Sequence, residues 1–312
     1  MPFSHHPRLF RVVRISRLMR ETRRLLAERS PDLVLVQNPP IHAVSAVAGY
    51  AHRHGMRFII DAHTGAFVNP GLLAGYYRRL FSIAGHWALK TLIHNEDLVP
   101  YAEKLGLDYL VLEMAVPEPL TQESTELRHP AVVAACGWGR DEPLSVLLAA
   151  ARLLPDVNFY LTGNRGTLPS FPPDAGRCPA ATEGQTWEMG VASPISNVLT
   201  TGFLPELDYW RLLNGCDVVA VLTTREATIL SGAYEALACR KPLVLSGTQT
   251  LARAFPKGAV LVENRAESLA GGISQALKHA SDVSLKGIEL AASKARDWER
   301  QFRALQEIIS AA

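Results

Sequence analysis

Residues 218–246 constrain the fold more than any other stretch of the chain, because their pattern predicts a strand, a polar loop, a helix and a second strand. The run 218–222 (VVAVL) is continuously apolar, which is typical of a strand buried in a parallel sheet. A helical period follows, and Pro242 ends it before the apolar run 243–245. Two strands joined by a helix predict a right-handed βαβ crossover, so the loop 223–231 should lie at the carboxyl end of a strand.

This loop and the helix after it are predicted to bind a ligand. In open α/β sheets ligands bind at the carboxyl ends of strands, and a helix start offers unpaired N–H groups with a partial positive charge. Ser231 and Gly232 would let the backbone approach an anion such as a nucleotide diphosphate. Glu226 and Glu235 flank the loop, and their carboxylates suit the hydroxyls of a sugar and a ribose.

Residues 235–242, Glu-Ala-Leu-Ala-Cys-Arg-Lys-Pro, resemble the acidic donor-site motif of GT-B glycosyltransferases of the family-4 type. That family has one Glu in a loop and a second Glu in a Glu-Ala-Xaa-Ala-Xaa-Gly-Lys-Pro context. Its two glutamates enclose seven residues, whereas Glu226 and Glu235 enclose eight. The resemblance implies that Glu235 binds the ribose and Glu226 the sugar. It also implies contacts to the diphosphate from Thr224, Arg225, Ser231 and Gly232. A plain βαβ unit with two surface acids is the alternative.

A second resemblance involves Gln37-Asn38-Pro39-Pro40 and Asp61-Ala62-His63-Thr64, each of which follows an apolar strand pattern. The pair is similar to the Gln-Asn-Pro-Pro and Asp-Trp-His-Asn of the β-mannosyltransferases that act on chitobiosyl-diphospho-dolichol. His63 is therefore predicted to act as general base for an acceptor hydroxyl, or as a hydrogen-bond donor to the donor sugar or phosphate. Asp61 would orient it. A purely structural His63 is the alternative.

The turn 136–143 after the strand 131–135 contains glycines that would allow a phosphate to approach. Family-4 enzymes have an Arg and a Lys here, but this chain has Trp138, Asp141 and Glu142, closer to the mannosyltransferases. The phosphate charge should then be met by Arg140, by Arg225 or by helix dipoles. Two backbone-turn residues, Gly137 and Asn164, complete the predicted donor site.

A chain of 312 residues with 48% hydrophobic residues predicts two domains. The alternation of strands and helices, together with the resemblance, implies an α/β fold with two Rossmann-like parallel-sheet domains facing a cleft. We expect an acceptor-side domain in 1–118, a polar linker, a nucleotide-sugar domain in 131–290 and a final helix in 291–312 that crosses back to the first domain. A surface insertion is expected in 165–197.

Compared with a full GT-B domain, which begins with a strand and a Gly-rich loop, the amino-terminal domain is expected to be incomplete. A complete sheet domain would need about 60 to 90 further residues. Residues 8–29 instead predict a helix, and the first thirty residues hold eight arginines against two glutamates. A basic amphipathic helix can bind anionic lipid, which would suit a lipid-linked acceptor. A solvated helix face is the alternative.

Several classes of protein are disfavoured by composition. A net charge of +2 gives no electrostatic case for nucleic acid, and no run is long enough to span a membrane. The start lacks a secretory h-region, so we expect a cytoplasmic protein, at the inner face of the membrane if the basic helix binds lipid. The four cysteines form no CxxC pair, and no metal site or cofactor is predicted.

The predicted function is metal-independent transfer of a hexose from a UDP- or GDP-linked sugar to a glycan or lipid-linked glycan, as in polysaccharide biosynthesis. The two resemblances differ on stereochemistry, because family-4 enzymes retain the anomeric configuration and the mannosyltransferases invert it. A non-catalytic sugar-nucleotide or glycan-binding module is the alternative from another class. A sugar-nucleotide epimerase is the competing enzyme.

Overall fold

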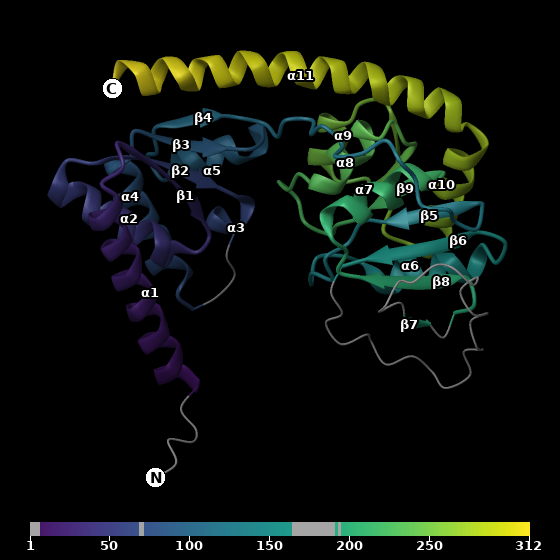
Figure 1. Cartoon of the computed structure of the whole chain (residues 1–312), viewed down its shortest axis with the longest axis horizontal. Helices are drawn as coiled ribbons and strands as arrows, with labels where there is room; N and C mark the ends of the chain where they lie inside the picture. The colour runs from purple at the N-terminus through teal and green to yellow at the C-terminus, as the bar shows by residue number, and fades with distance from the viewer. Residues whose placement is uncertain (1–6, 69–71, 164–190, 193–194) are drawn as a thin grey trace, which may run out of the picture. The chain divides into compact units, whose positions relative to one another are not determined.

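The computed structural model describes residues 7–68, 72–163, 191–192 and 195–312. It divides into two units, coloured from purple to yellow along the chain in Figure 1. Unit 1 comprises Met1–Glu113 and Trp298–Ala312, and unit 2 comprises Met114–Asp297. Asn164 lies outside the described residues, and so does the predicted insertion 165–197 except for 191–192 and 195–197.

Unit 1 is built on a four-stranded parallel sheet in the order β1-β2-β3-β4. Its strands are β1 (Leu33–Asn38), β2 (Arg57–Ala62), β3 (Lys90–Ile93) and β4 (Tyr109–Val111). Its helices are α1 (Pro7–Arg29), α2 (Ile41–His54), α3 (Thr64–Phe67), α4 (Ala74–Trp87), the 3-10 turn η1 (Glu96–Leu98) and α5 (Val99–Lys104). The apolar side chains of Phe58, Ile59 and Ile60 are all buried, as expected for a strand covered on both faces.

The last part of α11 (Ala280–Ala311) belongs to unit 1. Leu305 is buried with Ile59 and Leu92 of the sheet, and Phe302 packs beside them. The side-chain oxygen of Gln301 accepts a hydrogen bond from the backbone N–H of Glu113 at 2.8 Å. The final helix therefore supplies apolar surface that covers the unit 1 sheet.

Unit 2 contains a seven-stranded sheet in the order β11-β10-β9-β5-β6-β8-β7, in which only β7 is antiparallel to its neighbour. Its strands are β5 (Ala131–Ala134), β6 (Asn158–Thr162), β7 (Val191–Ala192), β8 (Val198–Gly202), β9 (Val218–Val221), β10 (Leu243–Ser246) and β11 (Ala259–Val262). Its other helices are α6 (Leu144–Leu153), α7 (Glu206–Gly215), α8 (Ser231–Ala238), α9 (Gln249–Ala254) and α10 (Ala266–Lys278). Strands β9 and β10 are connected by α8 and pair in parallel, which confirms the predicted βαβ unit.

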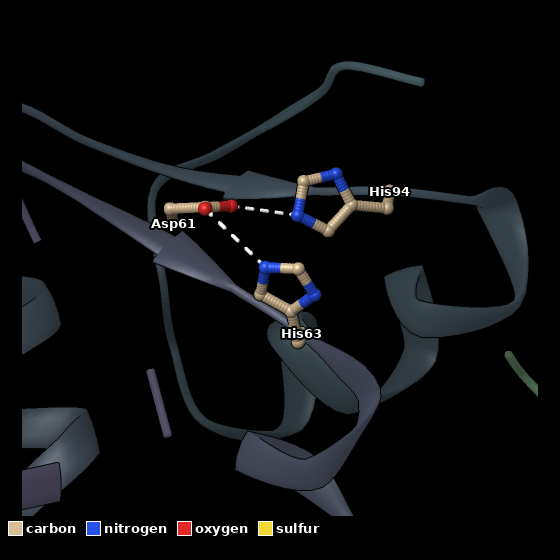
Figure 2. Close-up of side chains that lie close together, drawn as sticks. All are labelled: Asp61, His63 and His94. Carbon is tan, nitrogen blue, oxygen red and sulfur yellow. Dashed lines mark hydrogen bonds and ion pairs between the residues drawn. The ribbon is translucent and has the colours of Figure 1, made fainter. Parts of the chain in front are cut away.

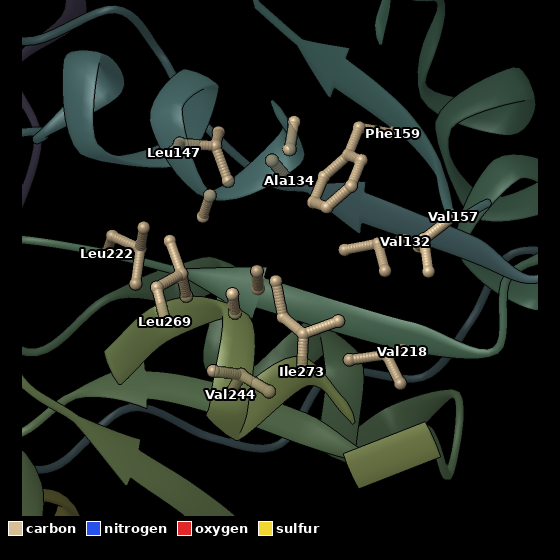
Figure 3. Packing of buried hydrophobic residues seen from close by; sticks show 14 of the residues in the cluster. Val132, Ala134, Leu147, Val157, Phe159, Val218, Leu222, Val244, Leu269 and Ile273 are labelled. Carbon is tan, nitrogen blue, oxygen red and sulfur yellow. The ribbon is translucent and has the colours of Figure 1, made fainter. Parts of the chain in front are cut away.

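The unit 2 sheet is buried on both faces. One face packs Val132 and Val218 against Leu147 of α6 and Ile273 of α10, as Figure 3 shows. The next residues along the strands, such as Val219, point to the other face, where a second core cluster contains the buried side chain of Tyr234 from α8. Alternate residues of each strand therefore serve opposite layers, so the strands read as continuous apolar runs.

Some elements differ from the sequence expectation. The third strand was expected over 91–95 but ends at Ile93, so His94 and Asn95 lie beyond its carboxyl end. Helices α4 and α9 were not predicted. In the part of the chain that the structure describes, none of the helices is both long and apolar enough to cross a bilayer.

Candidate functional site

Unit 2 has a pocket of about 910 Å³ at the carboxyl ends of its parallel strands. Its walls come from the carboxyl ends of β5, β6 and β9, from Phe203 and Leu204, from the first turn of α7 and from the start of α8. Four of the predicted donor residues line it, namely Gly137, Ser231, Gly232 and Glu235. The volume falls in the range of small-molecule sites, which are about 300 to 1,000 Å³.

Glu235 lies one turn into α8, where its carboxylate faces the pocket. The phenol of Tyr209 on α7 donates a hydrogen bond to Oε2 of Glu235 at 2.5 Å. Burial raises the pKa of the Glu235 carboxyl, and the bond from Tyr209 opposes that shift. Burial and the nearby carboxylate also raise the pKa of Tyr209, which keeps the phenol protonated as the donor.

Gly232 lets α8 approach the sheet closely. A Cβ added there would lie 2.9 Å from the Cβ of Ala135 and 3.3 Å from the methyl groups of Val221. No side chain fits at this position without movement of the helix. Glycine is therefore required at position 232 for helix packing, whether or not a ligand approaches the backbone at Ser231-Gly232.

The glycine turn after β5 is occupied by a carboxylate of the protein itself. Glu142 accepts hydrogen bonds from the backbone N–H groups of Gly137 and Gly139, each at 2.9 Å. Glu142, Glu206 and Glu235 all line the pocket, and no Lys or Arg is among its described lining residues. The pocket wall is therefore acidic, and Glu206 is the one acid of this lining that was not noted from the sequence.

Among the described residues, the other predicted donor residues, Arg140, Thr224, Arg225 and Glu226, are not part of this pocket lining. Arg140 is exposed, and a guanidinium nitrogen of Arg225 lies 3.8 Å from a carboxylate oxygen of Asp141. The backbone N–H of Thr224 donates to the carbonyl of Asp141 at 2.7 Å. These residues form a polar surface beside the β5 turn.

Glu226 lies at the start of α9 and is not among the pocket lining residues. Its carboxylate accepts from the backbone N–H of Gln249 at 3.3 Å and of Thr250 at 3.5 Å. A carboxylate at a helix N-terminus is stabilised by the helix dipole. Glu235 therefore lines the pocket, whereas Glu226 binds the first amides of α9.

In unit 1, three polar side chains meet where β2 and β3 end (Figure 2). Asp61 is at the end of β2, His63 follows it, and His94 follows β3. The backbone N–H of His63 also donates to the carbonyl of Asn38 at 2.9 Å, which links the two motifs found in the sequence. His94 was missed, although its place at a strand end beside a predicted site was a usable signal.

The carboxylate of Asp61 lies between the two imidazoles. Its Oδ1 is 2.6 Å from Nε2 of His94, and its Oδ2 is 3.3 Å from Nε2 of His63. Burial raises the pKa of Asp61, but the hydrogen bonds and charges of the two histidines outweigh it and hold that pKa well below its usual range. Within the described residues, this is the one group of three His, Cys, Asp or Glu side chains whose ligand atoms all lie within 4.8 Å of one another.

The two α/β units with parallel sheets, together with similarity to solved GT-B structures, confirm the predicted GT-B class with two Rossmann-like domains. No protein-family model and no curated protein matches the sequence, so the comparison rests on solved structures. HepE of Anabaena, in a structure with UDP and glucose, is similar with a TM-score of 0.69 and 14% identity, over 96% of this chain and 81% of that one.

Two further solved structures share the fold. The trehalose-phosphate synthase of Burkholderia xenovorans, with glucose-6-phosphate, matches with a TM-score of 0.67 and 13% identity, over 94% of this chain and 76% of that one. The pneumococcal O-GlcNAc transferase GtfA, with UDP and GlcNAc, matches with a TM-score of 0.64 and 13% identity, over 92% of this chain and 59% of that one.

Proposed function

We propose that this protein transfers a sugar from a nucleotide-diphosphate sugar to a hydroxyl of a glycan or lipid-linked glycan. The observation that carries the proposal is Glu235, held by Tyr209 in a pocket of suitable size at the start of α8. The fold is shared with the O-GlcNAc transferase GtfA, solved with UDP and GlcNAc, and with HepE, solved with UDP and glucose, which supports the same reaction class. Because several of those structures contain UDP, we propose UDP as the nucleotide in preference to GDP.

Unit 2 would bind the donor. Glu235 would accept hydrogen bonds from the ribose hydroxyls, and the N–H groups at Ser231 and Gly232 would face the diphosphate with the favourable end of the helix dipole. Arg140 and Arg225 are the proposed cations for the phosphates, because both side chains are exposed beside the β5 turn. Glu226 is proposed for the donor sugar, and this role requires its carboxylate to leave the amides of α9.

Unit 1 would supply the group that handles the acceptor proton. His63 is half-exposed, and its Nε2 is held by Asp61, which suits a general base. The reaction breaks the bond between the anomeric carbon and the diphosphate oxygen, and the developing charge needs hydrogen-bond donors. This division of roles explains why polar groups gather at the strand ends of both sheets.

The first test is thermal stability with UDP and with GDP, followed by product analysis with UDP-glucose and UDP-GlcNAc. A nucleotide that binds only the folded protein at 100 times its dissociation constant adds about 2.7 kcal/mol of stability. Transfer or hydrolysis supports the enzyme, whereas binding without turnover supports a non-catalytic module. In the enzyme, His63→Ala should lower the rate by about 10²-fold with UDP affinity unchanged.

We also propose that α1 binds an anionic membrane surface on the cytoplasmic side. Val13, Leu18 and Leu25 are exposed on this helix, and so are Arg14 and Arg17. Apolar and cationic side chains on one exposed helix suit the interface of an anionic bilayer.

Co-sedimentation with phosphatidylserine vesicles tests the membrane proposal, with phosphatidylcholine vesicles as the control. Binding should weaken as salt rises and should fall in an Arg14→Glu, Arg17→Glu variant. Equal binding of the variant, or no binding to either vesicle, would contradict this role of α1.

A further inference from the structure

The hydrogen bonds of His94 determine which of its ring nitrogens carry protons. Its Nδ1 lies 3.1 Å from the carbonyl oxygen of Leu112, which can only accept a hydrogen bond. Nδ1 must therefore carry a proton. Its Nε2 lies 2.6 Å from Oδ1 of Asp61, and an ionised carboxylate also only accepts. If Nε2 carried no proton, Nε2 and Oδ1 would both be hydrogen-bond acceptors and would repel each other at this distance. A proton or a metal ion must therefore lie between them.

A proton fits the gap between His94 and Asp61 better than a metal ion does. Charged N–H···O bonds are about 2.7 to 2.9 Å long, close to the observed 2.6 Å. Two ligands bound tetrahedrally to zinc at about 2.0 to 2.1 Å from the metal would be about 3.3 Å apart. His94 is then an imidazolium that donates from both nitrogens, and the depressed pKa of Asp61 agrees with a carboxylate in this position.

The second carboxylate oxygen sets the tautomer of His63. Oδ2 of Asp61 faces Nε2 of His63 at 3.3 Å, so the proton of a neutral His63 belongs on Nε2. Its Nδ1 points away from Asp61 in Figure 2 and keeps a lone pair. One carboxylate balances the charge of one imidazolium, and the ring centroids of the two histidines are only 4.6 Å apart. A second positive charge on His63 would be repelled by His94.

We infer that His94 is a positioning residue, which as an imidazolium holds Asp61 so that Asp61 fixes His63 with Nδ1 as its proton-accepting atom. The role of His63 in catalysis rests on the proposed function, whereas the positions of the protons on His94 and His63 do not. In the transfer, the acceptor hydroxyl would give its proton to Nδ1 while its oxygen bonds to the anomeric carbon. The bond from that carbon to the diphosphate breaks, and its electron pair leaves on the diphosphate oxygen.

The arrangement can be tested without any substrate, by NMR of the full chain with ¹⁵N-labelled histidine at neutral pH. We expect His94 to show protons on both ring nitrogens and His63 to show one on Nε2 alone. His94→Phe should shift the His63 signals to a mixture of tautomers, and His94→Gln should preserve part of the pattern by donating to Asp61. His86→Gln is the matched control, because His86 is exposed on α4 and, among the described residues, forms its hydrogen bond with the Ser82 carbonyl.

Two results would overturn the inference. One is a wild-type His94 with an unprotonated ring nitrogen. The other is stoichiometric binding of Zn²⁺ alone that shifts both histidine signals and is lost in His94→Phe, which would make the triad a metal site. If transfer is measurable, His94→Phe should lower it about tenfold or more while UDP affinity stays unchanged. If the NMR pattern is as expected but the protein transfers no sugar, the proposed function is wrong and the proton arrangement still holds.

Discussion

The phenol oxygen of Tyr209 lies 2.5 Å from Oε2 of Glu235, so a side chain from α7 fixes the orientation of a carboxylate on α8. The remaining oxygen of Glu235 is left for a ligand in the pocket. Because Tyr209 is the donor in this pair, an amide oxygen at residue 235 can accept the same bond.

Glu235→Gln should weaken UDP binding by about one to two orders of magnitude, because hydrogen bonds to a charged acceptor contribute roughly 1.5 to 3 kcal/mol. Its melting temperature should stay the same or rise slightly, since the raised pKa of Glu235 means that burying the charge costs stability at neutral pH. Calorimetric titration with UDP and thermal unfolding measure both effects.

Glu226→Gln is the matched comparison for Glu235→Gln, because it also removes one carboxylate charge. It should leave free UDP binding close to wild type and reduce sugar transfer, with a small loss of stability from the weaker start of α9. Equal losses of UDP affinity in the two variants would show that both carboxylates serve one subsite.

Glu142→Ala should strengthen UDP binding by about three- to tenfold, on the order of 1 kcal/mol. The change frees the N–H groups of Gly137 and Gly139 for phosphate and removes a negative charge from the pocket. Titration with UDP and with uridine separates the diphosphate effect from base and ribose contacts. Weaker UDP binding with the fold intact would mean that Glu142 itself contacts the nucleotide.

Asp61→Asn should destabilise the protein at neutral pH but progressively less in acid. The folded pKa of Asp61 lies below its ordinary value of 3.8, so its stabilising contribution is complete above that value and is lost as pH falls below it. In urea unfolding from pH 7 to pH 3, the stability difference between wild type and variant should be constant down to about pH 5 and should begin to narrow below about pH 4, without closing at pH 3. Asp108→Asn is the control at an exposed ion pair with Lys90, where little stability is expected to change. A constant difference across the range would contradict the assigned role of the carboxylate.

Gly232→Ala should destabilise unit 2 by about 1 to 3 kcal/mol, the usual cost of overpacking. The new methyl group would lie 2.9 Å from the Cβ of Ala135. Gly271→Ala, on α10, is the control, because a Cβ there meets no atom within 4 Å and should stabilise the helix by about 0.5 to 1 kcal/mol. Denaturant unfolding of the two variants should therefore shift in opposite directions.

Local pattern was sufficient for much of this fold and for part of the site. The apolar run at β9 and the stop at Pro242 define the crossover, and Glu235 follows from its place in that unit. The contact of Asp61 with His94 was missed, because it joins residues 33 positions apart across two strands, and the strand-end position of His94 was the one local signal for it. The position of Glu226 depends on α9, a helix of six residues that is too short to leave a periodic signal.

Helix α11 gives unit 1 a discontinuous sequence, since Trp298–Ala312 joins it only after all of unit 2. During synthesis, Leu305 is therefore not available to cover the apolar side chains of Ile59 and Leu92 until the whole of unit 2 has been made. Unit 2 has all of its residues available first, although it comes second in the sequence. The last turns of α11 are then the part of unit 1 that is synthesised last, and we expect unit 2 to complete its fold before unit 1 does.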